Sequence, residues 1–159
     1  MFEKGNYVVH NGHGVCKICE IINNCYKLET IHNGMSILMP CEKAVIFLRP
    51  LLSMNDIKKA ISEVLTNAEP YIKDNKERRI QFQTMVTSND IHDTLLLLLQ
   101  IYQISEDKKK EKKNLGSFDS QFLQVAERKV LYEISIAANI TKEESLKYIY
   151  ANLKPQLVL

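Results

Sequence analysis

The spacing of apolar residues along the chain changes near residue 53. Before this point the apolar residues fall in short runs rich in β-branched side chains, which is typical of β-strands. The runs cover 6–10, 15–22, 26–31, 36–39 and 45–48. Turn-forming residues separate them, and Asn33-Gly34 in particular favours a hairpin because both residues tolerate positive φ. The first part of the chain therefore predicts a small SH3/Tudor-like β-barrel of five strands.

Beyond residue 53 the apolar residues recur every three or four positions, which is the period of amphipathic helices. Helices are expected over 53–66, 75–86, 90–105, 119–139 and 142–153. Ser53 with Asp56, and Thr141 with Glu144, are spaced as helix-capping pairs. The leucine run 95–99 is apolar on nearly all sides, so its helix is expected at the centre of the bundle. The lysine-rich stretch 107–116 is expected to be a loop.

These patterns predict an α+β chain with two domains. Residues 1–52 are expected to form the β-barrel, and residues 53–159 an all-α bundle of about five helices. With 45% hydrophobic and 25% charged residues, the 159-residue chain has the composition of a folded protein. The net charge of +2 provides no global basic field, so any contact with nucleic acid depends on local clusters.

Two features of the sequence bear on its location. The N-terminus lacks the charged-then-apolar pattern of a secretory signal, and the leucine run is far shorter than the ~20 residues that span a bilayer. Four cysteines without an export signal are typical of reduced thiols, which favours a cytoplasmic protein with no membrane partner.

The pair Cys16 and Cys19 has the spacing of a zinc knuckle. Both residues fall within an expected strand, where side chains three apart point to opposite faces. No second pair of this kind follows, so we interpret the cysteines as small apolar side chains of the barrel. A small metal-binding adaptor remains an alternative function.

Catalytic patterns are weak. A Cys16–His13 nucleophile pair lacks an orienting carboxylate at a recognisable spacing, and the glycines near residue 12 do not lie between a strand and a helix. The sequence therefore predicts a protein that is not an enzyme, with no catalytic residues, no metal, no cofactor and no small-molecule substrate.

Several residues together resemble the RNA polymerase-interacting domain of CarD/CdnL-type bacterial transcription regulators, which the transcription-repair coupling factor shares. The N-terminal matches are Phe2, Gly5, Val8-Val9-His10, His13-Gly14-Val15 and Ile18. Met39-Pro40 and Leu48-Arg49-Pro50-Leu51-Leu52-Ser53 resemble the end of that domain. Arg78-Arg79, Phe122-Leu123, Ala126, Leu131 and Glu133 resemble the helical domain of CarD/CdnL.

The resemblance implies two partners, the RNA polymerase β subunit and promoter DNA. An edge strand of the barrel would pair with the β subunit, and the helical domain would lie on promoter DNA and modulate the stability of the open complex. Met39 and Pro40 fall on the polymerase-facing segment, whereas Asn24 and Leu38 stand where some relatives have arginines. Localisation would be cytoplasmic, and nucleoid-associated through the polymerase.

The largest departure from the family pattern is the absence of tryptophan. Relatives carry a tryptophan wedge just before the paired arginines, and this chain has Lys76 there. The candidate DNA-binding residues are Lys73, Lys76, Arg78 and Arg79. A second basic cluster lies at 108–113, and Tyr71 or Phe82 is the nearby candidate to replace the aromatic ring. A divergent paralogue that binds polymerase with little DNA engagement is therefore the second interpretation.

Overall fold

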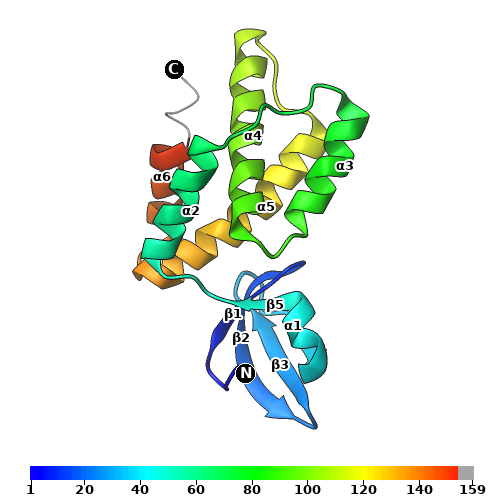
Figure 1. Ribbon diagram of the computed structural model, residues 1–159, viewed down its shortest axis with the longest axis vertical. Helices are drawn as coiled ribbons and strands as arrows, with labels where there is room; N and C mark the ends of the chain where they lie inside the picture. Colours follow the sequence, from blue (N-terminus) through cyan, green and yellow to red (C-terminus); the bar gives the residue numbers. More distant parts are fainter. Residues whose placement is uncertain (154–159) are drawn as a thin grey trace.

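The computed structural model describes residues 1–153. A β-sheet forms one end of the elongated molecule and a bundle of helices forms the other, as Figure 1 shows. The strands are β1 (Tyr7–His10), β2 (Gly14–Ile22), β3 (Cys25–Thr30), β4 (Ser36–Pro40) and β5 (Leu48–Pro50). All neighbouring strands pair antiparallel. The α+β class expected from the sequence is confirmed.

The sheet is open rather than closed. Its strand order is β4-β3-β2-β1-β5, so β4 and β5 form its two edges, and they do not pair with each other in the part of the chain that the structure describes. The SH3/Tudor-like barrel expected from the sequence is therefore not confirmed.

The prediction of a fifth strand at 45–48 is wrong. A 3-10 turn, η1 (Cys41–Lys43), leads into a one-turn helix, α1 (Ala44–Phe47), and β5 begins only at Leu48. The β-branched pair Val45-Ile46 has a strong strand propensity, but tertiary contacts made by the flanking residues override it.

Five helices follow residue 53, close to where the apolar period placed them. They are α2 (Met54–Thr66), α3 (Asn75–Val86), α4 (Ile91–Lys110), α5 (Ser117–Ala138) and α6 (Lys142–Leu153). With α1, which the sequence did not predict, residues 1–153 contain six α-helices. The expected capping pairs form: Ser53 Oγ accepts from the Asp56 N–H at 3.2 Å, and Thr141 Oγ1 from the Glu144 N–H at 3.1 Å. The expected loop at 107–116 is shorter, because α4 extends to Lys110.

The apolar core is divided into two clusters. One lies in the helices and includes the fully buried Leu95, Leu97 and Leu98 of α4, as the leucine run predicted. The other lies against the sheet and includes Ile18 and Leu28. No apolar residue belongs to both clusters. The apolar clusters therefore do not merge at the contact between sheet and helices, and the buried Val9 and Val15 belong to neither cluster. The division into domains 1–52 and 53–159 stays a prediction.

Candidate functional site

Strand β4 presents a free backbone edge. The Cys41 N–H donates to the Asn24 carbonyl at 3.0 Å, and the Thr30 N–H donates to the Met35 carbonyl at 2.9 Å. Hydrogen-bonded pairs alternate along an antiparallel ladder, and the register pairs Tyr26 with Met39. The backbone groups of residues 37 and 39 therefore face β3, whereas those of Ser36 and Leu38 face outward.

The side chains of β4 alternate between the two faces of the sheet. Leu38 is 69% exposed, whereas Met39 is buried in the sheet core. Pro40 ends the strand and is half-buried. Asn24 lies at the adjacent β2–β3 turn with φ of 61° and is exposed. Of the four predicted polymerase-binding residues, the structure thus brings all to one edge, but it offers the side chain of Met39 to the core and not to a partner.

The opposite edge of the sheet is held against the helices by an ion pair. Arg49 of β5 donates to both carboxylate oxygens of Glu133 on α5, at 2.6 and 2.7 Å. The Leu52 N–H also donates to Glu133, at 3.0 Å, and the Glu133 side chain is 1% exposed. Arg49 Nε donates to the carbonyl of Asn89, in the α3–α4 turn, at 2.7 Å.

A buried lysine makes the second polar link between sheet and helices. Lys129 Nζ on α5 donates to the carbonyls of Asn11, Val86 and Ser88 at 3.0, 2.9 and 3.2 Å. Burial, and then the positive charge of Arg49, lower the pKa of Lys129 from 10.5 to about 8. We call Arg49, Glu133, Asn89 and Lys129 the polar clasp, because together they fix β5 and the β1–β2 turn to the helices.

The β1–β2 turn that accepts a hydrogen bond from Lys129 is the segment His10-Asn11-Gly12-His13. The Nδ1 atom of His10 accepts hydrogen bonds from the N–H groups of Gly12 and His13, at 3.0 and 3.2 Å. Burial lowers the pKa of His10 to about 4, so the ring is neutral and Nδ1 is free to accept. This histidine closes a turn and orders the surface that contacts α5.

The four predicted DNA-binding residues separate into two groups. Lys73, just before α3, and Lys76 and Arg79, in its first turns, are exposed, whereas Arg78 is buried. Arg78 forms an ion pair of 2.9 Å with Asp119 on α5.

Every N–H group of the Arg78 guanidinium has a partner within the chain. Nε and Nη2 donate to the two oxygens of Asp119, and Nη2 also donates to Asn75. Nη1 donates to the carbonyls of Ile72 and Lys73. Because a guanidinium has five N–H donors, none is left for a phosphate. Arg78 thus holds the 71–75 segment against α5.

Arg79 lies over an exposed aromatic ring that the sequence reading missed. Its guanidinium carbon is 3.7 Å from the ring centroid of Phe118, in the first turn of α5. Phe82, one candidate for the missing aromatic, is fully buried, and Tyr71 donates a 2.6 Å hydrogen bond to Asp107. We define the α3 surface as Lys73, Lys76, Arg79 and Phe118. Phe118 was missed because Arg79, its neighbour in space, lies 39 positions away in the sequence.

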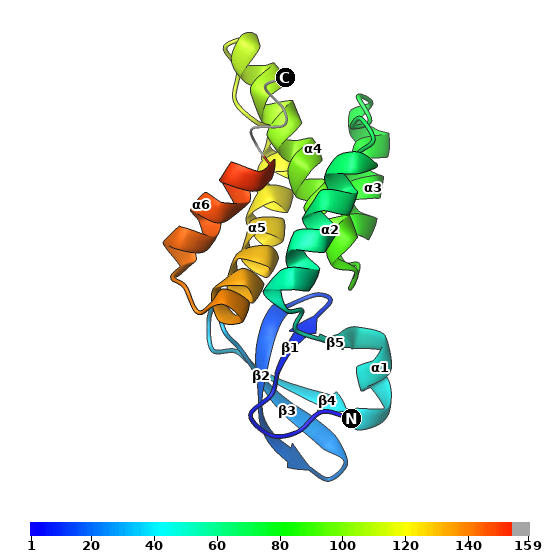
Figure 2. The same cartoon turned by 60° about the vertical axis from the view of Figure 1, so that its left-hand side comes forward.

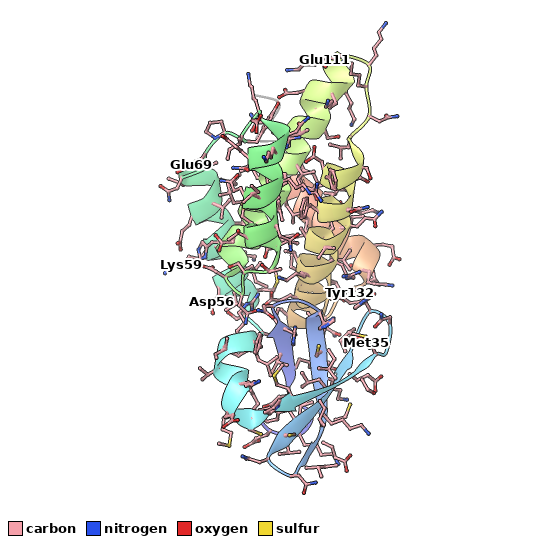
Figure 3. The ribbon with its side chains drawn as sticks, turned by 90° about the vertical axis from the view of Figure 1, so that its right-hand side faces the viewer. Met35, Asp56, Lys59, Glu69, Glu111 and Tyr132 are labelled. Carbon is pink, nitrogen blue, oxygen red and sulfur yellow. The ribbon has the colours of Figure 1, made fainter. Side chains whose placement is uncertain are left out.

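The second basic cluster lies far from the sheet. Figure 3 shows Glu111 at the tip of the molecule opposite the sheet, and Met35 at the turn that leads into β4. The lysines at 108–110 belong to the last turn of α4, where positive charge is favourable for the helix dipole. The presence of these lysines is therefore accounted for by their favourable interaction with the helix dipole.

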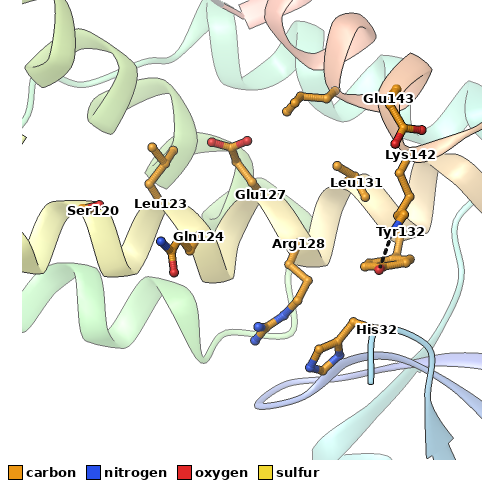
Figure 4. Close-up of a pocket in the computed structure, with 11 residues that line it drawn as sticks. His32, Ser120, Leu123, Gln124, Glu127, Arg128, Leu131, Tyr132, Lys142 and Glu143 are labelled. Atoms are coloured by element: carbon orange, nitrogen blue, oxygen red, sulfur yellow. Dashed lines mark hydrogen bonds between the residues drawn. The ribbon is translucent and has the colours of Figure 1, made fainter. Parts of the chain in front are cut away.

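An open cavity of about 640 Å³ lies where α5, α6 and the β3–β4 turn meet, as Figure 4 shows. The cavity is lined by side chains of both polar and apolar type: His32, Ser120, Leu123, Gln124, Glu127, Arg128, Leu131, Tyr132, Lys142, Glu143 and Leu146. Burial raises the pKa of Glu127 and lowers that of His32. The two cations and two carboxylates balance, so the cavity has no marked preference for an anion or a cation.

The cysteine pair has a structural environment. Cys16 is fully buried in the sheet core, and burial raises the pKa of its thiol to about 12. Zinc binds thiolate, so this value disfavours Cys16 as a ligand. Within residues 1–153 no group of three or more metal-ligating side chains is gathered, and no helix there is long and apolar enough to span a membrane.

The structure combines a sheet with an unpaired edge, at which a strand could in principle be added, and a helical bundle joined to that sheet by the polar clasp. Residues 2–52 match the family model described as the CarD-like/TRCF RID domain. The matched 51 residues are about a third of the chain, and within them the resemblance seen in the sequence is confirmed. No curated protein matches the chain. For residues 2–52 the match is to an RNA polymerase-interacting domain.

Proposed function

We propose that the chain is a CarD/CdnL-like transcription regulator that docks on the β subunit of RNA polymerase and modulates the stability of the promoter open complex. The observation that carries the proposal is the unpaired edge of β4 in a domain of the CarD-like/TRCF RID family. The protein acts by binding and shifting an equilibrium, not by catalysis, and works in the cytoplasm, on the nucleoid, through its polymerase partner.

Docking occurs by strand addition at β4. A polymerase strand hydrogen-bonds with the outward backbone groups of Ser36 and Leu38, which supplies affinity without charged side chains. The exposed Leu38 side chain contributes apolar contact. Asn24 and Leu38 replace the arginines of some relatives, so binding of this chain depends less on salt than an ion-pair interface does.

The α3 surface contacts promoter DNA. Lys73, Lys76 and Arg79 neutralise phosphates, and the log of the binding constant then falls with the log of salt concentration by about 0.9 per contact. Phe118, with Arg79 stacked on it, is the exposed aromatic group beside these cations. Arg78 is left out of this surface because its donors are occupied.

The polar clasp connects the sheet that carries the β4 edge to the helices that carry the α3 surface. Since β5 and α5 are joined by the Arg49–Glu133 pair, the orientation of the bundle relative to β4 is set by the protein itself. DNA would therefore be met at a fixed position once the sheet has docked.

A second candidate is a polymerase-binding paralogue with little DNA engagement. The absence of tryptophan and the internal use of Arg78 favour it, since both reduce the groups available to DNA. A loss of DNA effect with intact polymerase binding distinguishes this candidate from the first.

The test is binding of the full chain to core RNA polymerase with two variants of one residue. Leu38→Pro removes an outward N–H but no bond to β3, and it should weaken binding at least tenfold. Leu38→Thr keeps the backbone N–H and a high strand propensity but removes the leucine side chain. Comparison of the two variants therefore separates the contribution of the backbone to binding from that of the side chain. Equal affinity of wild type and Leu38→Pro would contradict docking through β4.

A further inference from the structure

Helix α1, which follows the proposed docking edge three residues later in the chain, exposes two large apolar side chains. Val45 is 91% exposed and Ile46 is 66% exposed, so neither contributes to the sheet core. The sequence pattern predicts a strand here, and the chain instead forms a single helical turn. β-Branched residues are not favoured in helices, so this turn is not formed because of local propensity.

The turn is held firmly by its first and last residues. Ala44 is buried, and the Phe47 ring stacks on His10 with 6.1 Å between ring centroids and an interplanar angle of 11°. The Phe47 carbonyl accepts from the Asn11 N–H at 3.0 Å and from Asn89 Nδ2 at 3.1 Å. Residues 44 and 47 share the inner face of the helix, which leaves 45 and 46 on the outer face.

This arrangement presents Val45 and Ile46 in a fixed position. A contact group held in place loses little conformational entropy on binding, which favours affinity. Exposed apolar groups in a place where the local sequence preference is overridden are typical of functional surfaces. The neighbouring Glu42 and Lys43 are exposed and provide a polar rim.

The turn continues directly from the β4 edge. The β3–β4 ladder extends to Cys41, which donates to the Asn24 carbonyl, and α1 begins at Ala44. Three residues span at most about 10 Å, so α1 begins beside the end of the free edge. Figure 2 shows α1 at the side of the sheet, next to β5.

We propose that Val45 and Ile46 are a second, apolar anchor, which enters an apolar recess on the same RNA polymerase surface that pairs with β4. This inference rests on the proposed function and adds to it the side-chain contact that backbone pairing lacks. Backbone hydrogen bonds between strands depend little on the sequence of the partner. Two apolar side chains buried in a recess would fix the position of the interface on the partner.

The experiment compares the affinity for core RNA polymerase, without DNA, of the full-length wild type and three variants. Ile46→Ser and Val45→Ser should each bind about tenfold more weakly than wild type, as expected for an interface residue worth roughly 1.4 kcal/mol. Ile80→Ser on α3 is the matched control, because Ile80 is 63% exposed and lies on the helical bundle. It should bind like wild type.

The outcomes separate this inference from the proposed function. Unchanged affinity of both α1 variants, with wild type binding and Leu38→Pro impaired, overturns the anchor and leaves docking through β4 intact. Failure of the wild type to bind overturns both. A wild-type dimer that dissociates in the α1 variants, measured by sedimentation, overturns the anchor in favour of a second copy of this chain. Unfolding curves equal to wild type confirm that the variants are folded.

Discussion

Glu133→Gln should destabilise the protein by about 3 kcal/mol, because it breaks a buried ion pair at one partner. Glu133 is 1% exposed and accepts three hydrogen bonds, two from Arg49 and one from the Leu52 N–H. The glutamine oxygen can replace one carboxylate oxygen, but its NH₂ group would face a guanidinium N–H, donor against donor. Breaking a buried pair in this way typically costs about 3–5 kcal/mol.

The lower part of that range applies here. Arg49 is 19% exposed and keeps its bonds to the carbonyls of Asn89 and Pro50, so its charge is not left wholly without partners. A folded protein of this size has a stability of roughly 5–15 kcal/mol, so the variant should remain folded. Urea unfolding followed by far-UV circular dichroism measures the loss directly.

The control is Glu111→Gln, which removes the same charge from an exposed pair. Glu111 and Lys113 are 3.5 Å apart with both side chains more than half exposed, so the loss should stay below about 1 kcal/mol. The double variant Arg49→Met/Glu133→Leu removes both charges and should be more stable than Glu133→Gln alone. The reasoning is refuted if Glu133→Gln loses no more stability than Glu111→Gln.

Three other predictions concern the clasp and the α3 surface. The pKa of Lys129 falls from 10.5 to about 8 on folding, so the unfolded state binds more protons between these pH values and stability rises with pH there. Relative to Lys129→Met, the wild type should gain up to about 3 kcal/mol across this window in urea titrations; a difference that does not change with pH would contradict a lowered pKa. Arg79→Glu should weaken binding to promoter fork DNA and reduce its salt slope by about one phosphate contact, whereas Lys59→Glu on α2 should leave the slope unchanged; equal slopes for wild type and Arg79→Glu would remove Arg79 from the DNA surface. Lys76→Trp should lengthen the lifetime of the open complex, because an aromatic wedge offsets unstacking at the fork, and an unchanged lifetime with intact polymerase binding would place the bundle elsewhere.

The sequence predicted the helices better than the sheet end. Helix positions follow from the 3.6-residue period and from caps such as Ser53, and these signals are local. The fifth strand was wrong at 45–48 because strand propensity says nothing of the contacts that hold Phe47 against His10. Sheet closure depends on non-local pairing, and alternation alone does not decide it.

The candidate site was predicted only in part. The exposed cations at 73, 76 and 79 follow from composition and helix period, but Arg78 could not be told from Arg79 without its partner Asp119, which lies 41 positions away. The Arg49–Glu133 pair spans 84 positions and was equally invisible. Both residues belonged to the family resemblance, yet the pattern gave no sign that they contact each other.

The polar clasp is the physical link between the sheet and the helical bundle. Lys129 and Arg49 join elements from both ends of the molecule, and the apolar clusters on either side do not merge. A polar joint of this kind is specific in geometry because each donor must meet its acceptor. Docking at β4 and contact through α3 are therefore expected to be coupled by position.

The central claim, docking of β4 on RNA polymerase, is tested most directly by amide hydrogen exchange of the full chain with and without core polymerase. In the free protein the outward N–H groups of Ser36 and Leu38 should exchange rapidly, whereas those of residues 37 and 39, bonded to β3, should be protected. The account predicts that polymerase protects the amides of Ser36 and Leu38. Bound polymerase that leaves these two amides exchanging as fast as in the free protein would contradict it.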